Sequence, residues 1–320
     1  MTTMKKQELT LAGVPAILYG ERSRKVYLYV HGKNGCKEEA ERFANTACAA
    51  GWQVLAIDLP EHGARKDRPE QLLPWAVVPE IQAVYARMQP VWPHIRLYGV
   101  SIGAWLAMQA LRAEKLEKAL REARLDVRGL TALDVGASTG GFTDCLLQHG
   151  AAEVFSVDVG HDQLHPSLRQ DTRVHSLEGT DIRRTECMME LLGGRRPDFC
   201  TVDVSFISLE QVGSAVFSLL SPAAPVVWLI KPQFEAGRGA VGKKGIVRQK
   251  SDHVRVLEKA CAFFYSQGYG VCWLSHSPIR GGEGNVEYLT VLRKNDAEET
   301  IRTTVDEVVE KAWRELGGRG

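Results

Sequence analysis

The fold of this chain is decided by Leu133-Asp-Val-Gly136-Ala-Ser138-Thr139-Gly140-Gly141-Phe142, which follows an apolar run that begins at Leu130. The apolar run predicts a strand, and the residues after the glycines predict a helix. Glycines at such a turn let backbone amides approach a cofactor closely, because they carry no Cβ atom. The turn by itself is equally compatible with a dinucleotide site or with a tight corner that binds nothing.

The next predicted strand ends in an acid, Asp158, about 20 residues after the turn, where a carboxylate can accept hydrogen bonds from ribose hydroxyls. The alternative for Asp158 is a helix cap or a plain surface acid. We therefore predict a cofactor site built from the turn and this acid. Its members are Gly136, Ser138, Thr139, Gly140, Gly141, Phe142 and Asp158.

Two successive α/β patterns organise the chain. Apolar runs predict strands at 26–30, 53–57 and 96–100 in the first pattern, and at 130–135, 153–157, 199–204, 226–230, 270–274 and 287–292 in the second. Helical stretches between the later strands predict a mainly parallel, doubly wound sheet. One helix over Ala104–Arg124 joins the patterns without a flexible linker, and an amphipathic helix over Ala297–Leu316 closes the chain, with Ile301, Val305, Val308, Val309, Trp313 and Leu316 on one face.

The first pattern resembles the α/β-hydrolase fold over residues 1–112. Gly99-Val-Ser101-Ile-Gly103 has the form of a nucleophile turn between a strand and a helix, and His31-Gly-Lys-Asn-Gly35 stands where an oxyanion-binding loop is expected. In that fold the acid and the histidine of the triad follow the serine, whereas His31 and His62 precede it. We therefore interpret this part as a truncated hydrolase-like segment with hydrolase activity unlikely, because a serine without a base is a weak nucleophile.

The second pattern resembles the TlyA-type family over residues 113–320. The resemblance rests on LDVGASTGGFTDCLLQHGAAEVFSVDVGHDQL (133–164), VDVSFISL (202–209), LIKPQFEAGRGAVGKKGIV (229–247) and GGEGNVEYL (281–289). Proteins of this family are often labelled hemolysins and contain an FtsJ-like methyltransferase domain. The resemblance implies a Rossmann-like class I methyltransferase with S-adenosyl-L-methionine as its cofactor, which methylates the 2′-hydroxyl of cytidine in ribosomal RNA of the 16S/23S type.

The same resemblance implies a catalytic set of two lysines and two acids. Their matches in this sequence are Lys115, Asp203, Lys231 and Glu287. Asp203 and Lys231 both lie at the carboxyl ends of predicted strands, which form the ligand-binding edge of open α/β sheets. Glu287 begins the antiparallel strand with which methyltransferase sheets of this type end. A lysine can accept a hydroxyl proton only when burial or a nearby cation lowers its pKa. We expect Lys115 to provide that second cation and the two carboxylates to hold the ammonium groups, the alternative being a solvated Lys/Glu network.

RNA contacts are expected from a local patch, since the net charge of the whole chain is only +1. The segment from Lys231 to Lys250 holds six basic residues, one acid and four glycines; the basic residues are Lys231, Arg238, Lys243, Lys244, Arg248 and Lys250. It predicts a mobile loop that contacts RNA phosphates, or else a plain solvated loop. The small RNA-binding domain that precedes the methyltransferase in family members is replaced here by the hydrolase-like segment.

Composition limits the remaining alternatives. Seven scattered cysteines without a C-x-x-C pair favour reduced thiols in a cytoplasmic protein, with no metal site. No apolar run is long enough to span a bilayer, so we expect no membrane association. Ribosomal RNA or ribosomal subunits are the expected partners. A serine hydrolase and a non-catalytic RNA- or cofactor-binding protein are the competing functions.

Overall fold

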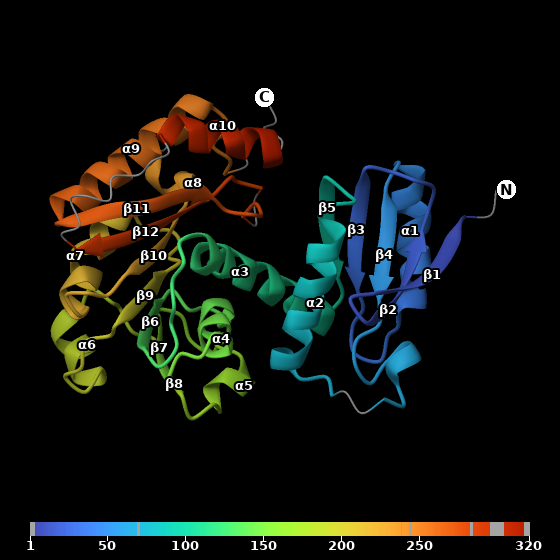
Figure 1. Ribbon diagram of the computed structural model, residues 1–320, viewed down its shortest axis with the longest axis horizontal. Coiled ribbons are helices and arrows are strands. Elements are labelled where there is room, and N and C mark those ends of the chain that lie inside the picture. The colour runs from blue at the N-terminus through green and yellow to red at the C-terminus, as the bar shows by residue number, and fades with distance from the viewer. Residues whose placement is uncertain are drawn as a thin grey trace. The chain divides into compact units, whose positions relative to one another are not determined.

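The computed structural model describes residues 4–68, 71–237, 239–242, 245–281, 284–294 and 304–316 (Figure 1). Its contacts divide the chain into two compact units, Met1–Arg112 and Ala113–Gly320. The division falls within one helix, α3 (Ile102–Glu122), as the absence of a linker in the sequence suggested.

The first unit contains a five-stranded sheet in the order β1-β2-β4-β3-β5. Its strands are β1 (Lys6–Leu11), β2 (Val14–Tyr19), β3 (Lys25–Val30), β4 (Gln53–Ile57) and β5 (His94–Gly99). The last three are parallel, and β1 and β2 form a hairpin that joins β4 in antiparallel fashion. Helix α1 (Ala40–Ala49) packs on one face, while α2 (Pro74–Met88) and the start of α3 pack on the other.

The second unit contains a seven-stranded sheet in the order β11-β12-β10-β9-β6-β7-β8. These strands are β6 (Thr131–Val135), β7 (Glu153–Asp158), β8 (Val174–Glu178), β9 (Phe199–Val202), β10 (Val226–Ile230), β11 (Tyr269–His276) and β12 (Tyr288–Lys294). Strand β12 runs antiparallel to both of its neighbours, β10 and β11. The sheet is therefore mixed, with a parallel centre, and the prediction of an α/β methyltransferase-like fold is confirmed.

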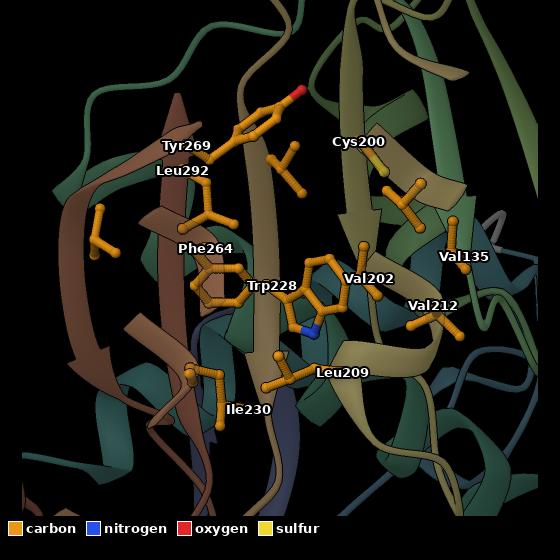
Figure 2. Close-up of a cluster of buried hydrophobic side chains, with 14 of the residues drawn as sticks. Val135, Cys200, Val202, Leu209, Val212, Trp228, Ile230, Phe264, Tyr269 and Leu292 are labelled. Atoms are coloured by element: carbon orange, nitrogen blue, oxygen red, sulfur yellow. The ribbon is translucent and has the colours of Figure 1, made fainter. Parts of the chain in front are cut away.

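Helices cover both faces of this sheet, so the central strands are buried on both sides and read in the sequence as continuous apolar runs. The helices are α4 (Gly141–Gln148), α5 (Pro166–Arg169), α6 (Thr185–Leu191), α7 (Leu209–Leu219), α8 (Pro232–Glu235), α9 (Lys250–Ser266) and α10 (Val305–Leu316). One core surrounds Trp228 and Phe264, which are fully buried between β10 and helix α9 (Figure 2). The other core joins α4 to Leu116 and Leu120 of α3.

The described residues bear on three further features of the sequence, namely the closing helix, the cysteines and the apolar runs. Helix α10 begins at Val305 and buries Val308 and Val309, whereas residues 297–303 of the predicted helix, with Ile301, lie outside the described part of the chain. All seven cysteines are free thiols. Among the helices that the structure describes, none is long and apolar enough to cross a bilayer.

Candidate active site

Asp203 and Lys231 form an ion pair at the carboxyl edge of the second sheet. Asp203 follows β9 and Lys231 follows β10, and these strands are parallel neighbours, so their ends meet. The Lys231 Nζ lies 2.5 Å from Asp203 Oδ1 and donates a 2.8 Å hydrogen bond to Ser205 Oγ. The lysine and aspartate side chains are only 11% and 9% exposed, so this is a nearly buried pair rather than a solvated one.

Lys115 and Glu287 form a second, more deeply buried pair. Lys115 Nζ on α3 donates to Glu287 Oε2 at 2.6 Å, with 8% and 4% of the side chains exposed. Glu287 directly precedes β12, in which Tyr288 pairs with Ile230. Because β12 is antiparallel to β10, Glu287 and Lys231 are level with each other at the same edge of the sheet.

Gly281 lies against the Glu287 carboxylate and leaves space for it because it has no side chain. A Cβ atom at position 281 would lie 2.3 Å from Glu287 Oε1, so no larger residue fits there without moving the carboxylate. The Glu287 carbonyl also accepts a 2.8 Å hydrogen bond from the Ser277 amide. The segment before β12 is thus packed around this one acid.

The glycine-rich turn lies against the backbone of Asp203. Gly136 has φ +82°, and a Cβ atom there would approach the Asp203 carbonyl oxygen to 2.5 Å. The Asp203 amide in turn donates to the Val135 carbonyl at 2.9 Å. Gly140, at φ +96°, precedes the first residue of α4 and faces Leu164 and Leu168. Both glycines therefore hold conformations and contacts that a side chain would disturb.

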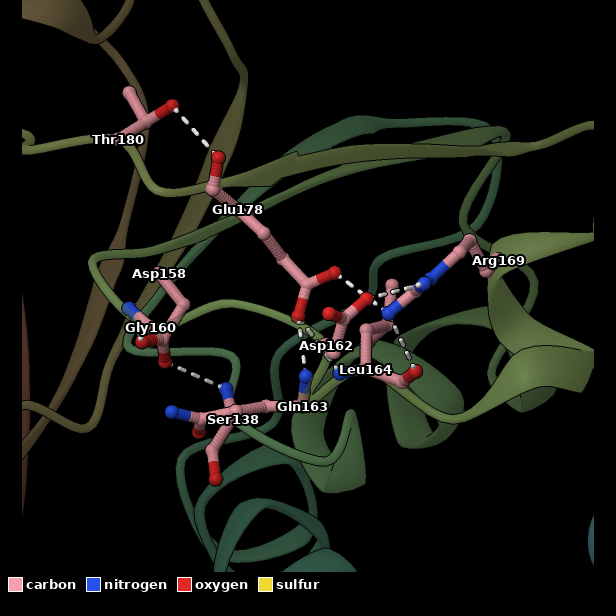
Figure 3. Close-up of polar contacts among 9 residues, drawn as sticks. All are labelled: Ser138, Asp158, Gly160, Asp162, Gln163, Leu164, Arg169, Glu178 and Thr180. Carbon is pink, nitrogen blue, oxygen red and sulfur yellow. Dashed lines mark hydrogen bonds and ion pairs between the residues drawn. The ribbon is translucent and has the colours of Figure 1, made fainter.

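Asp158 ties the end of β7 to this turn (Figure 3). One carboxylate oxygen accepts from the Ser138 amide and the other from the Gly160 amide, each at 2.8 Å. These partners are turn amides, not the amides of a helix N-terminus, so Asp158 is not a helix cap. A carboxylate has about four lone-pair sites, which leaves capacity for ribose hydroxyls as well.

Two acids that the sequence analysis did not single out stabilise the surroundings of the turn. Glu178, at the end of β8, accepts from the Gln163 and Leu164 amides at 2.6 and 3.0 Å and pairs with Arg169 (Figure 3). Asp134, inside β6, is fully buried, and its two oxygens accept from the hydroxyls of Thr143 and Thr201. Burial raises the pKa of Asp134 to about 6. The sequence offered one signal for Asp134, because an acid within an apolar strand is unusual.

Beside the Asp203–Lys231 pair, Phe206 is 90% exposed with φ +63°, and its ring lies 5.0 Å from that of Phe234. The sequence analysis overlooked this residue, although a phenylalanine next to polar serines at a strand end was a signal. A large exposed ring beside a polar site is suited to stacking on a planar substrate group.

A buried lysine, Lys118, follows Lys115 by one helical turn. It donates to the His276 carbonyl at 2.8 Å, and burial lowers its pKa. Lys118 thus fixes the end of β11 and does not belong to the two ion pairs.

The basic segment 231–250 is less cationic than its sequence suggests. Lys231 pairs with Asp203, and Lys250 pairs with Glu310 at 2.6 Å. Arg238, Lys243 and Lys244 lie outside the described residues. The far end of the segment is fixed by Asn285, whose side chain accepts from the Val247 amide and donates to the Gly245 carbonyl.

In the first unit, Ser101 occupies a strained turn between β5 and α3, at φ +51°. A Cβ atom at Gly103 would lie 2.1 Å from the His31 carbonyl oxygen, so the turn is packed closely against the loop after β3. Both ring nitrogens of each nearby histidine are hydrogen-bonded to backbone groups. His31 donates to the Gly32 carbonyl and accepts from the Leu59 amide, and His62 donates to the Pro60 carbonyl and accepts from the Asn34 amide. Neither ring nitrogen of either histidine is left to act as a base for Ser101.

The geometry of the second unit defines a class of protein. It is that of α/β enzymes of the methyltransferase type, in which a cofactor lies along the glycine turn and the acceptor meets polar groups at the strand ends. The profile of FtsJ-like methyltransferases matches residues 112–294, and the chain belongs to this family.

Sequence relatives extend this result. The protein YqxC of Bacillus subtilis is 45% identical over 206 residues, which cover 63% of this chain and 73% of that protein. The 16S/23S rRNA (cytidine-2′-O)-methyltransferase TlyA of Mycobacterium tuberculosis is 39% identical over 212 residues, or 66% of this chain and 77% of TlyA. A solved structure from Streptococcus thermophilus, labelled a hemolysin, is 45% identical with a TM-score of 0.60, covering 64% of this chain and 74% of its own.

Proposed function

We propose that the chain transfers a methyl group from S-adenosyl-L-methionine to the 2′-hydroxyl of cytidine in ribosomal RNA. The observation that carries the proposal is the placement of two nearly buried lysine–carboxylate pairs on one sheet edge, beside a glycine turn with an acid behind it. The tuberculosis relative TlyA, a 16S/23S rRNA (cytidine-2′-O)-methyltransferase, supports the choice of substrate. Because ribosomes are its substrate source, we also propose a cytoplasmic location.

The residues present fit the cofactor. The positive φ angles of Gly136 and Gly140 leave the turn without side chains where a ligand would approach, and Asp158 retains acceptor sites for ribose hydroxyls. We assign Ser138, Thr139, Gly141 and Phe142 to the same site. The cofactor, when bound, supplies a methyl group on a positively charged sulfur, so the protein need not activate the leaving group.

The protein's task is then to align the 2′-oxygen and remove its proton. We assign proton removal to Lys231, whose ammonium group must first release a proton to solvent before Nζ accepts the proton of the 2′-hydroxyl. Asp203 and Ser205 orient that nitrogen. The Lys115–Glu287 pair lies at the same edge of the sheet, and the exposed Phe206 ring offers a surface on which the target base can stack.

The function is tested with methyl-labelled S-adenosylmethionine and purified 16S and 23S ribosomal RNA, 30S subunits and 50S subunits. We expect label in at least one RNA, and mass spectrometry of nuclease fragments should place it on a ribose 2′-oxygen of cytidine. An oligonucleotide with 2′-deoxycytidine at the mapped position serves as the control and should accept no label. Label on a base instead of a ribose would contradict the proposal.

Asp158→Ala should weaken S-adenosylmethionine binding by about 1–3 kcal/mol, because the variant loses both the ribose acceptor and the link to the Ser138 amide. Isothermal titration calorimetry measures this change. Asp162→Ala, an exposed acid in the same loop, is the matched control and should bind normally. An unchanged affinity in a folded Asp158 variant would remove this residue from the site.

We further propose that residues 1–112 are a truncated α/β-hydrolase-like segment without hydrolase activity. The Ser101 turn supports the likeness, and the backbone hydrogen bonds of His31 and His62 support the lack of activity.

A fluorophosphonate probe should therefore label Ser101 poorly, and ester hydrolysis by the chain should equal that of its Ser101→Ala variant. Mass spectrometry of the labelled protein and a chromogenic ester assay give the two readouts. Rapid stoichiometric labelling would show that a base reaches this serine.

A further inference from the structure

One face of the first unit carries a group of aromatic and basic side chains that the methyltransferase site does not use. We define it as the aromatic–basic strip, formed by Lys25, Tyr27, Phe43, Trp52, Arg96 and Tyr98. Strands β3 and β5 pair so that Tyr27 is level with Arg96, and these side chains share the face on which α1 packs. The core beneath α1 contains residues of β2, β3 and β4. Strand β5 lies at the edge of the sheet, and its residues Arg96 and Tyr98 are exposed.

The strip is rigid. The Arg96 guanidinium lies 4.5 Å from the centre of the Trp52 ring and donates to the Tyr27 hydroxyl at 3.2 Å. The Tyr98 ring stacks on that of Phe43 at 4.0 Å and still leaves 40% of the residue exposed. Side chains already held in place lose little conformational entropy when a ligand binds.

The cations of the strip are not neutralised. Among the residues that the structure describes, no carboxylate pairs with Lys25 or Arg96, nor with Arg22 or Arg24 in the segment leading into β3. Residues 1–112 contain 14 lysines and arginines against 10 acids, whereas residues 113–320 contain 26 against 29. The excess positive charge of the chain therefore belongs to the first unit.

Unpaired cations beside one exposed and three half-buried aromatic rings match the two chemical features of single-stranded RNA, its phosphates and the faces of its unstacked bases. We propose that the aromatic–basic strip binds single-stranded segments of the RNA substrate. The proposal rests on the proposed function in naming RNA, and it gives the first unit a binding role in place of hydrolysis.

The test is fluorescence anisotropy of the full chain with a labelled 12-nucleotide single-stranded RNA of mixed sequence. The double variant Lys25→Glu/Arg96→Glu should bind at least about tenfold more weakly. The slope of log affinity against log salt should fall by about 1.4, since each lost phosphate contact on a single strand accounts for about 0.7. The control Arg68→Glu/Arg87→Glu changes two exposed arginines of the same unit by the same total charge and should change affinity less than about threefold.

Tyr98→Leu separates stacking from charge, because it should weaken binding several-fold without changing the salt slope. In methyl transfer to ribosomal RNA, the strip variants should raise KM and leave kcat unchanged. Equal losses in the strip variant and the control would overturn the inference, as would a strip that instead pairs two copies of the chain in analytical ultracentrifugation. If the wild-type chain binds RNA through the strip but transfers no methyl group, the proposed function is wrong, whereas the inference about RNA binding by the strip is supported.

Discussion

Replacing Lys231 with alanine is expected to lower methyl transfer on the order of 10²-fold or more while S-adenosylmethionine still binds normally. The side chain lost is the one that we assign to proton removal, and general bases of this kind contribute roughly 10²–10⁴-fold to rate. The cofactor turn does not depend on it, because Gly136 and Asp158 are held by backbone groups. Single-turnover transfer of labelled methyl to RNA, together with calorimetry for the cofactor, separates the two effects.

Lys250→Ala is the matched control for this experiment. Lys250 ends the same basic segment, but its ammonium group pairs with Glu310 on α10 and takes no part in the Asp203 pair. We expect its turnover to stay within about threefold of the wild type, as is usual for an exposed ion pair. Near-normal turnover of Lys231→Ala would show that this lysine is not the base.

Replacing Glu287 with leucine is expected to destabilise the second unit by about 3–5 kcal/mol, because it leaves the Lys115 ammonium buried without a counter-charge. The double variant Lys115→Met/Glu287→Leu should recover most of that loss, since two apolar side chains of similar volume can replace a buried ion pair. Hydrogen exchange of β10 and β12 amides in increasing urea measures the stability of this unit separately from the first.

The double variant should regain stability without regaining methyl transfer. The double variant restores packing but not charge, so methyl transfer should remain as low as in the single Glu287 variant. If Glu287→Leu is as stable as the wild type, the Lys115 ammonium group must reach solvent easily. A double variant with restored turnover would show that the pair has only a structural role.

The sequence predicted most of the strands that are buried on both faces, because such strands are unbroken apolar runs. The predictions at 53–57 and 226–230 coincide with β4 and β10. Strands β1, β2 and β8 were missed. β1 is mostly exposed and polar, and β8 lies at the edge of its sheet with only Val174 buried, so neither shows a strong apolar pattern.

For the site, the sequence placed polar residues at strand ends but could not determine how they pair. The expected role of Lys115 was that of a cation near Lys231, whereas the structure joins Lys115 to Glu287 and Lys231 to Asp203. Such pairing depends on which strands are neighbours, and the position of β12 between β10 and β11 is a property of the whole sheet. The roles of these four residues remain predictions.

Helix α3 contributes to a hydrophobic core of each unit, with Leu106 and Ala110 in the first unit and Leu116 and Leu120 in the second. Starting a helix is unfavourable, whereas extending it adds one hydrogen bond for each residue fixed, and isolated helices shorter than about 12–15 residues are marginal in water. Each unit contributes only about half of the 21 residues of α3. One nucleation event therefore serves both units, and whichever core forms first during synthesis provides a template for the helix of the other.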